Sequence, residues 1–153
     1  MFKAEAQTQT SVLALADSLY GLGNYSQAIN AYAKENALTS RLQIARAYNA
    51  IGNYDKSVVQ YEAIILKDPD SQIARFELGK LYFKIGDFRK ANEVFYELSK
   101  EEKENPEYHY YLGETYREML EDASSLVAYK NAVAIDSTHL RSLFQLGKYF
   151  VVK

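Results

Sequence analysis

The sequence predicts an all-α protein made of stacked antiparallel helix pairs, and the main evidence is an internal repeat. Short strings with the order large apolar, small, then aromatic or large apolar one turn later begin at Leu15, Ile44, Leu78, Leu112 and Leu146, and these residues are 29, 34, 34 and 34 positions apart. A fixed period of this size indicates stacked supersecondary units. Only 2 prolines and 7 glycines occur among 153 residues, which disfavours a many-turned β fold.

The repeated strings predict the first helix of each unit. On a helix, residues separated by one turn share a face, so each string forms one apolar stripe. The small residue in the middle lets a second helix approach closely. Glycine in an exposed helix costs about 1 kcal/mol relative to alanine. We therefore expect Gly79, Gly113 and Gly147 to lie against a neighbouring helix.

A turn and a second helix follow in each unit. Three turns have the form Gly-Asn/Asp-aromatic, starting at Gly23, Gly52 and Gly86. Glycine suits the left-handed residue that ends a helix, and Asn or Asp suits the start of the next one. The second helices carry a small residue and an aromatic residue one turn later, in the pairs Ala28/Tyr32, Ser57/Tyr61, Ala91/Phe95 and Ser125/Tyr129. Each unit is therefore expected to be a helical hairpin.

In chain order, the expected helices are 9–22 and 25–37, 39–51 and 54–67, 72–85 and 88–101, 106–119 and 122–135, and then 139–151. The expected organisation is a single repeat domain, with an N-terminal tail (1–8), a short first repeat (9–37), three full repeats (38–71, 72–105 and 106–139) and a last first-helix or capping helix (140–153). Asn105 should cap a helix that has Pro106 at its first position.

Two units depart from the pattern. The first is five residues shorter than the 34-residue period, so its second helix or the loop after Ala37 should be cut back. The fourth has Leu120-Glu121-Asp122 where the others have glycine, which leaves the form of its turn open.

Over residues 9–153 this pattern resembles the tetratricopeptide repeat family, whose unit has 34 residues with the same large-small-aromatic helix, glycine turn and small-aromatic helix. The resemblance implies a right-handed superhelical solenoid. It also implies a concave groove, lined by the first helices, that holds extended peptides or partner helices.

Composition argues against several other functions. The formal net charge is −2 with both signs interspersed, so nucleic acid is not an expected partner. The sequence has no apolar run of 18 residues, so membrane insertion is not expected either. The absence of cysteine does not distinguish compartments, and both a cytoplasmic and a periplasmic location remain open.

No arrangement of residues typical of an enzyme was found. His109 and His139 are far apart with no companion at a metal-ligand spacing, so both are expected to be surface or packing residues. Glu114 and Glu118 share a helix face, but general acid-base chemistry would also need a dry pocket. No catalytic residue, cofactor site or metal site is therefore predicted.

The side of each first helix displaced from the core stripe is the expected partner-binding groove. Aromatic residues and arginine, which dominate many interfaces, recur there. An equally plausible interpretation is that these residues pack between adjacent first helices. The positions of the carboxylate clamp found in co-chaperone members of the family do not carry a full clamp, so binding of a chaperone tail is not expected. The candidate groove residues are Leu13, Tyr20, Leu42, Arg46, Phe76, Lys80, Phe83, Tyr110, Arg117, Phe144 and Lys148.

The sequence thus favours a non-catalytic scaffold for protein-protein interaction that binds a peptide or partner helix. An alternative is a substrate-recruiting or regulatory segment of a larger enzyme or sensor. The apolar end of the sequence, Tyr149 to Lys153, suggests a fragment of a longer array, or self-association through the last helix.

Overall fold

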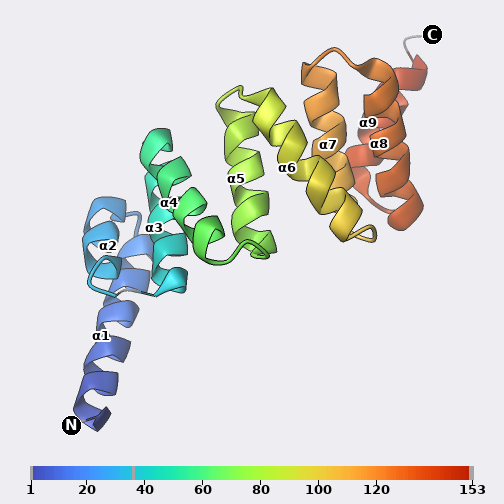
Figure 1. Cartoon of the computed structure of the whole chain (residues 1–153). Helices are drawn as coiled ribbons and strands as arrows, with labels where there is room; N and C mark the ends of the chain where they lie inside the picture. Colours follow the sequence, from blue (N-terminus) through green and yellow to red (C-terminus); the bar gives the residue numbers. More distant parts are fainter. Residues whose placement is uncertain (1, 36, 152–153) are drawn as a thin grey trace. The chain divides into compact units, whose positions relative to one another are not determined.

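The computed structural model describes residues 2–35 and 37–151, with side chains from residue 12 onward. Within these ranges every regular element is an α-helix (Figure 1). The chain divides into two compact units, residues 1–74 and 75–153.

The first unit consists of two helical hairpins. Helix α1 (Phe2–Gly21) pairs with α2 (Tyr25–Tyr32), and α3 (Leu38–Ala50) pairs with α4 (Tyr54–Lys67). Helix α2 also packs against α3, so the two hairpins form one stack. Helix α2 has 8 residues whereas α4 has 14, so the first unit is cut back in its second helix. The helix ends at Tyr32, and the expected end at residue 37 was wrong.

Helix α1 starts earlier than the sequence pattern indicated. The expected start was residue 9, after a tail, but the helix begins at Phe2. The segment 3–7 reads Lys-Ala-Glu-Ala-Gln, all strong helix formers, and contains neither glycine nor proline to end a helix. The apolar repeat marks only the part of a helix that packs, so it could not show this extension. Met1 lies outside the described residues.

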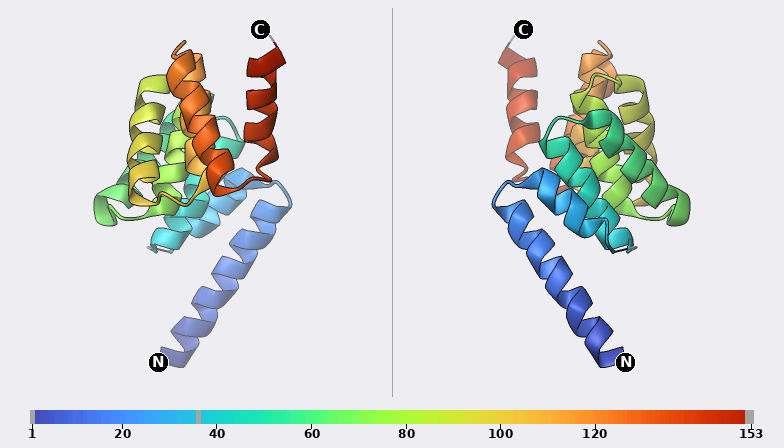
Figure 2. Two further views of the ribbon diagram at one scale, coloured as in Figure 1. Left: turned by 90° about the vertical axis from the view of Figure 1, so that its right-hand side faces the viewer. Right: turned by 90° about the vertical axis from the view of Figure 1, so that its left-hand side faces the viewer.

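The second unit contains most of α5 (Gln72–Lys84) together with α6 (Phe88–Glu101), α7 (Pro106–Glu118), α8 (Asp122–Ile135) and α9 (Leu140–Val151). Helix α7 packs against both α6 and α8, and α8 packs against α9. Figure 2 shows α9, in red, beyond α8 at the C-terminal end of this unit. The bounds of helices α5 to α9 lie within a few residues of those expected from the sequence.

Close packing of the repeated glycines is confirmed at two of the three positions. A Cβ atom built on Gly79 would lie 2.9 Å from Phe95 Cε1, and one on Gly113 would lie 2.6 Å from Tyr129 Cε1. Both distances are shorter than a normal carbon-carbon contact, so only glycine allows the ring to approach. A Cβ on Gly147 would meet no described atom within 4 Å, so the prediction is wrong there, because no described helix covers that face of α9.

Leu15 is a second exception to the predicted core stripe. Its side chain is 57% exposed, although the equivalent Leu78 and Leu112 are buried. None of the described helices lies where the preceding unit of an internal repeat would cover Leu15. The adjacent Ala16 is fully buried together with Ala28 and Tyr32, as predicted.

The inter-helix turns share one backbone form. Gly23, Gly52 and Gly86 adopt φ values of +79°, +79° and +83°, in agreement with the predicted left-handed caps. In the fourth repeat Leu120 takes the same role at φ 63°, so the turn survives without glycine. Where Gly86 is followed by Asp87, the carboxylate accepts a hydrogen bond from the Lys90 backbone N-H.

The helix start at Pro106 was also predicted correctly. Asn105 Oδ1 accepts a hydrogen bond from the backbone N-H of Glu107 at 3.1 Å, and Pro106 occupies the first turn of α7. This cap satisfies one of the N-H groups that the helix itself cannot pair.

Candidate functional site

In the first unit most of the candidate groove residues pack against neighbouring side chains. Leu13 and Tyr20 lie against the buried cluster formed by α1 and α2. The Tyr20 ring also meets Tyr25 edge-on, with 5.1 Å between ring centroids. Leu42 is half-buried, and the guanidinium of Arg46 donates a hydrogen bond to Gln43 on the same helix. These side chains therefore stabilise the hairpins and leave only part of their surface for a partner.

In the second unit Phe76 lies within a cluster of aromatic rings. Its ring centroid is 5.1 Å from that of Tyr108 and 5.4 Å from that of Tyr111, both on α7. Lys80 lies one turn further along α5 and places its Nζ 4.9 Å from the Phe76 ring centroid. The packing interpretation therefore holds for Phe76, whereas Lys80 forms the edge of the cluster. Phe83, on the next turn, packs edge-on against Phe88.

Tyr110 is the α7 residue at the position equivalent to Phe76, and it also packs. Its ring contacts Tyr129 on α8 at 6.1 Å and His139 at 5.5 Å. The guanidinium of Arg141 lies over its face, 4.5 Å from the ring centroid. Burial raises the pKa of the Tyr110 hydroxyl, so this ring stays neutral.

A buried carboxylate lies beside this ring. Glu114 accepts hydrogen bonds from the Tyr129 hydroxyl at 2.6 Å and from Gln145 Nε2 at 2.8 Å. Arg117, one turn further along α7, forms an ion pair with it at 2.9 Å. A buried charge is tolerated only when it is paired in this way. Burial, together with the hydrogen bond to Glu114, raises the pKa of Tyr129 well above its ordinary value.

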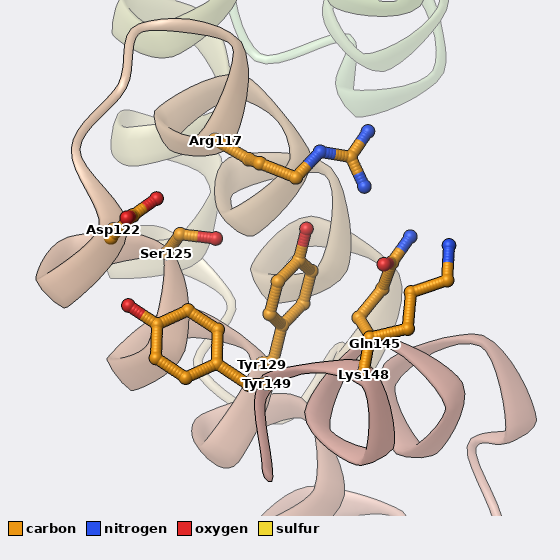
Figure 3. A pocket seen from close by; sticks show the side chains of 7 residues that line it. All are labelled: Arg117, Asp122, Ser125, Tyr129, Gln145, Lys148 and Tyr149. Carbon is orange, nitrogen blue, oxygen red and sulfur yellow. The ribbon is translucent and has the colours of Figure 1, made fainter. Parts of the chain in front are cut away.

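A cavity of about 620 Å³ opens between α7, α8 and α9 around this network. Figure 3 shows the Tyr129 hydroxyl pointing toward the Arg117 guanidinium, with the Gln145 amide and the Lys148 ammonium group on the α9 side. The lining is mixed in charge and rich in hydrogen-bonding groups. It is formed by Arg117, Asp122, Ser125, Tyr129, Gln145, Lys148 and Tyr149.

The candidate residues on α9 are the most accessible of the set. Phe144 is 63% exposed, and Lys148 Nζ lies 4.4 Å from its ring centroid. No carboxylate pairs with Lys148 or Lys80 in the described part of the chain, whereas Arg117 is bound to Glu114 and Glu118. The accessible aromatic surface and the two lysines without ion pairs therefore lie within the second unit.

The two histidines are held by hydrogen-bonding neighbours within the second unit. His139 is buried, with its Nε2 3.0 Å from Glu107 Oε1 and its Nδ1 2.8 Å from Ser142 Oγ. His109 Nε2 lies 3.3 Å from the Lys103 carbonyl oxygen, and burial lowers the pKa of this ring. Within residues 2–35 and 37–151, no group of three or more metal-ligating side chains was found that could hold an ion.

Sequence reasoning did not identify Tyr129 and Gln145 as parts of the groove. A signal was nevertheless present in the repeats. The first and fourth units have an acidic residue on the first helix and a tyrosine on the second, and the Tyr32 hydroxyl donates to Asp17 as Tyr129 does to Glu114. The third unit has Lys80 with Phe95, which has no hydroxyl. In the first and fourth units a tyrosine hydroxyl is thus paired with a carboxylate of the first helix.

The structure consists of stacked helical hairpins. Each hairpin closes on a glycine or alanine, and aromatic side chains lie along the first helices. These features define a helical-repeat protein of the protein-interaction class. The sequence model of the tetratricopeptide repeat matches residues 52–114. The predicted resemblance to the tetratricopeptide repeat family is therefore confirmed over this segment. A comparison with curated proteins finds no match.

Solved structures of MamA have the same fold. MamA from Desulfovibrio magneticus RS-1 (residues 41 to the end) superposes with a TM-score of 0.83 at 18% identity, covering 94% of this chain and 84% of that one. A second MamA crystal structure gives 0.81 at 22% identity, covering 93% and 80%. The predicted all-α fold of tetratricopeptide-type antiparallel helix pairs is confirmed. None of the described helices is both long enough and apolar enough to span a membrane.

Proposed function

We propose that the chain is a non-catalytic scaffold that binds a peptide or partner helix along the groove side of its first helices. The single observation that carries this proposal is the accessible aromatic and cationic surface of the second unit. There Lys80 and Lys148 lie over aromatic rings without a carboxylate partner among the described residues. Aromatic anchors beside cationic groups are frequent among the residues that dominate binding energy.

The same surface indicates the chemistry of the partner. Two carboxylates of this unit are already paired, Glu114 with Arg117 and Glu107 with Arg141. The remaining positive charge favours acidic side chains, and the exposed Phe144 ring favours an apolar one. We therefore expect a segment that combines aspartate or glutamate with an apolar anchor.

Alanine at Phe144 and Lys148 together provides the test. Phe76 is less suitable, because its contacts with Tyr108 and Tyr111 would be lost and the fold would be weakened. Phe144 is mostly exposed and Lys148 lies over its ring without an ion pair among the described residues, so the double variant should remain folded. It should weaken a native partner by about 2 kcal/mol, the scale of an interface hot spot.

Leu66→Ala with Lys67→Ala is the matched control. This pair is also an exposed apolar residue and an exposed lysine, but it lies at the end of α4, outside the groove row. Both variants would be used as bait with a lysate of the source cells, after circular dichroism has verified their helicity. A partner that is retained by the groove variant and lost by the α4 variant would contradict the proposed site.

A further inference from the structure

A second cleft, of about 460 Å³, lies between the third and fourth repeats. Helix α7 runs between α6 and α8 (Figure 1). It contributes His109, Leu112 and Tyr116, which follow one another at intervals of three and four residues and so share one face of the helix. The groove residues Tyr110 and Arg117 lie on another face of α7. The cleft is therefore separate from the proposed groove.

The cleft exists because α8 places short side chains opposite aromatic rings. Tyr96 of α6 and Tyr116 of α7 line it, whereas α8 contributes the small residues Ala123, Ser124 and Ala128. A concave site of this volume, with apolar and aromatic walls and a few polar groups, has the usual composition of a small-molecule site.

The lining of the cleft carries no formal charge, since the described residues that form it include no aspartate, glutamate, lysine or arginine. His109 Nε2 lies 3.3 Å from the Lys103 carbonyl oxygen. A carbonyl oxygen only accepts, so Nε2 carries the hydrogen and Nδ1 has the lone pair. Burial lowers the pKa of His109, in agreement with a neutral ring. The cleft therefore suits a neutral ligand.

One hydrogen-bonding group of this lining is unsatisfied. His109 Nδ1 is buried, and no described residue donates a hydrogen bond to it. Buried polar atoms without a partner are rare in folded proteins and cost free energy. The two serine hydroxyls of the cleft already donate elsewhere, Ser99 to the Tyr96 carbonyl oxygen and Ser124 to Glu121. The unsatisfied buried group is therefore an acceptor, and it calls for a ligand that donates.

We propose that this cleft binds a neutral aromatic small molecule that carries an N-H or O-H donor, such as an indole or a phenol. The ligand ring lies among Tyr96, Tyr116 and His109, since aromatic rings attract one another at such distances. Its donor pairs with His109 Nδ1, which becomes accessible when the imidazole turns away from its long contact with Lys103.

The rim of the cleft favours a small molecule over a protein partner. A stable protein interface buries about 800 Å² on each side. Among the described residues that line the cleft, only Tyr96 and Val127 are large, apolar and exposed. On the same turn of α6 as Tyr96, Glu97 and Lys100 form an exposed ion pair with each other. Two apolar side chains do not supply the area that a protein partner needs.

Indole is the probe, because the chain contains no tryptophan and indole fluorescence can be excited selectively. Titration with the whole chain should give a saturable rise in anisotropy. In a long-range ¹H–¹⁵N spectrum, the His109 Nδ1 signal should move to lower frequency as its lone pair accepts a hydrogen bond. His139, the other histidine of the chain, is the internal control, because its Nδ1 already accepts from the Ser142 backbone N-H.

Two alanine positions on α8 locate the site. Ala123→Leu fills the cleft and should weaken indole binding at least about tenfold, because its added carbons overlap the ligand. Ala134→Leu is the matched control, since it makes the same change at an exposed position of α8 that does not line the cleft. It should leave the affinity for indole unchanged. Circular dichroism would verify that each variant is folded.

His109→Phe tests the acceptor, because it keeps a ring of similar size and removes Nδ1. It should weaken indole about fivefold, the scale of one hydrogen bond between neutral groups. Benzothiophene has nearly the same shape as indole but no N-H, and its affinity, measured by displacement of indole, should hardly change in this variant.

Several results would overturn the proposal. These are absence of saturable indole binding, Ala123→Leu binding no weaker than Ala134→Leu, an unmoved His109 Nδ1 signal at saturation, and equal weakening of indole and benzothiophene by His109→Phe. N-acetyltryptophanamide, which carries the same ring on a peptide backbone, tests the remaining occupant. Tighter binding of this compound than of indole would show that the cleft takes a side chain of a partner protein, and the assignment to a small molecule would be wrong.

Discussion

Individual residues show how the repeat tolerates departures from its own pattern. Leu120 occupies the left-handed turn position that glycine holds in the three earlier hairpins. A non-glycine residue in this region costs about 1–2 kcal/mol, because its Cβ crowds the following carbonyl oxygen. The backbone hydrogen bond from Glu121 N-H to the Tyr116 carbonyl oxygen nevertheless closes the turn, like its counterpart from Asp87 to Tyr82.

Leu120→Gly should therefore stabilise the chain. The Leu120 side chain is 87% exposed, so its removal loses little burial, and the strain is relieved. We expect a gain of about 0.5–1 kcal/mol, reduced from the full strain by the greater freedom of glycine in the unfolded chain. Urea denaturation would measure it. The reverse change, Gly86→Ala, should destabilise by about 1 kcal/mol, and a loss of stability in Leu120→Gly would contradict this explanation.

At the scale of helices, the glycine contacts determine how closely a hairpin closes. Gly113→Ala should cost about 1–3 kcal/mol, because its methyl group would overlap the Tyr129 ring and force the helices apart. Gly147→Ala should instead stabilise by up to about 1 kcal/mol, since it gains helix propensity in open space. Thermal unfolding of the two variants tests the pair. Equal effects would show that the two glycines share one environment.

A second contact at this scale joins the start of α9 to the start of α7. Glu107 accepts from Arg141, and its Oε1 lies 3.0 Å from His139 Nε2. Burial opposes ionisation of Glu107, but these hydrogen bonds outweigh it and hold its pKa below the ordinary 4.5. A lowered folded-state pKa stabilises the fold above the unfolded-state pKa, and that stabilisation is lost as the pH falls through the folded value.

Glu107→Gln should thus destabilise the chain by about 1 kcal/mol at pH 7, a modest value because the carboxylate is partly exposed. The difference from wild type should shrink as the pH falls below 4.5. Denaturation curves at several pH values would show it. Glu104→Gln, an exposed carboxylate in the preceding loop with the same change in charge, is the control and should have little effect at any pH. A difference that persists unchanged at acidic pH would contradict the role of the Glu107 charge.

At the scale of the whole molecule, the repeat pattern predicted the features that arise within one hairpin. The helix pairs, the glycine turns and the Asn105 cap follow from local rules that act within one hairpin. Leu15 and Gly147 differ because their burial depends on a further helix beside them, and each lies in a repeat at one end of the described stack. The pattern within one repeat does not show whether such a helix lies beside it.

The candidate groove was predictable only as a set of positions. The same row contains Phe76 and Tyr110, which pack against neighbouring rings, and Phe144, which remains exposed. Which of them is free for a partner depends on the side chains contributed by the next helix. The pairing of Tyr129 and Gln145 with Glu114 likewise depends on three helices meeting, which spacing along one helix does not show.

Site-specific photocrosslinking would show whether the groove side of the second unit binds a protein. A benzoylphenylalanine residue would replace Phe144 in one sample, and Leu66 or Val127, which are exposed outside the groove row, in two others. After irradiation in a lysate of the source cells, mass spectrometry would identify the adducts. One dominant protein adduct is expected at position 144 and not at positions 66 or 127. Adducts to the same protein at 66 or 127, with none at 144, would contradict it.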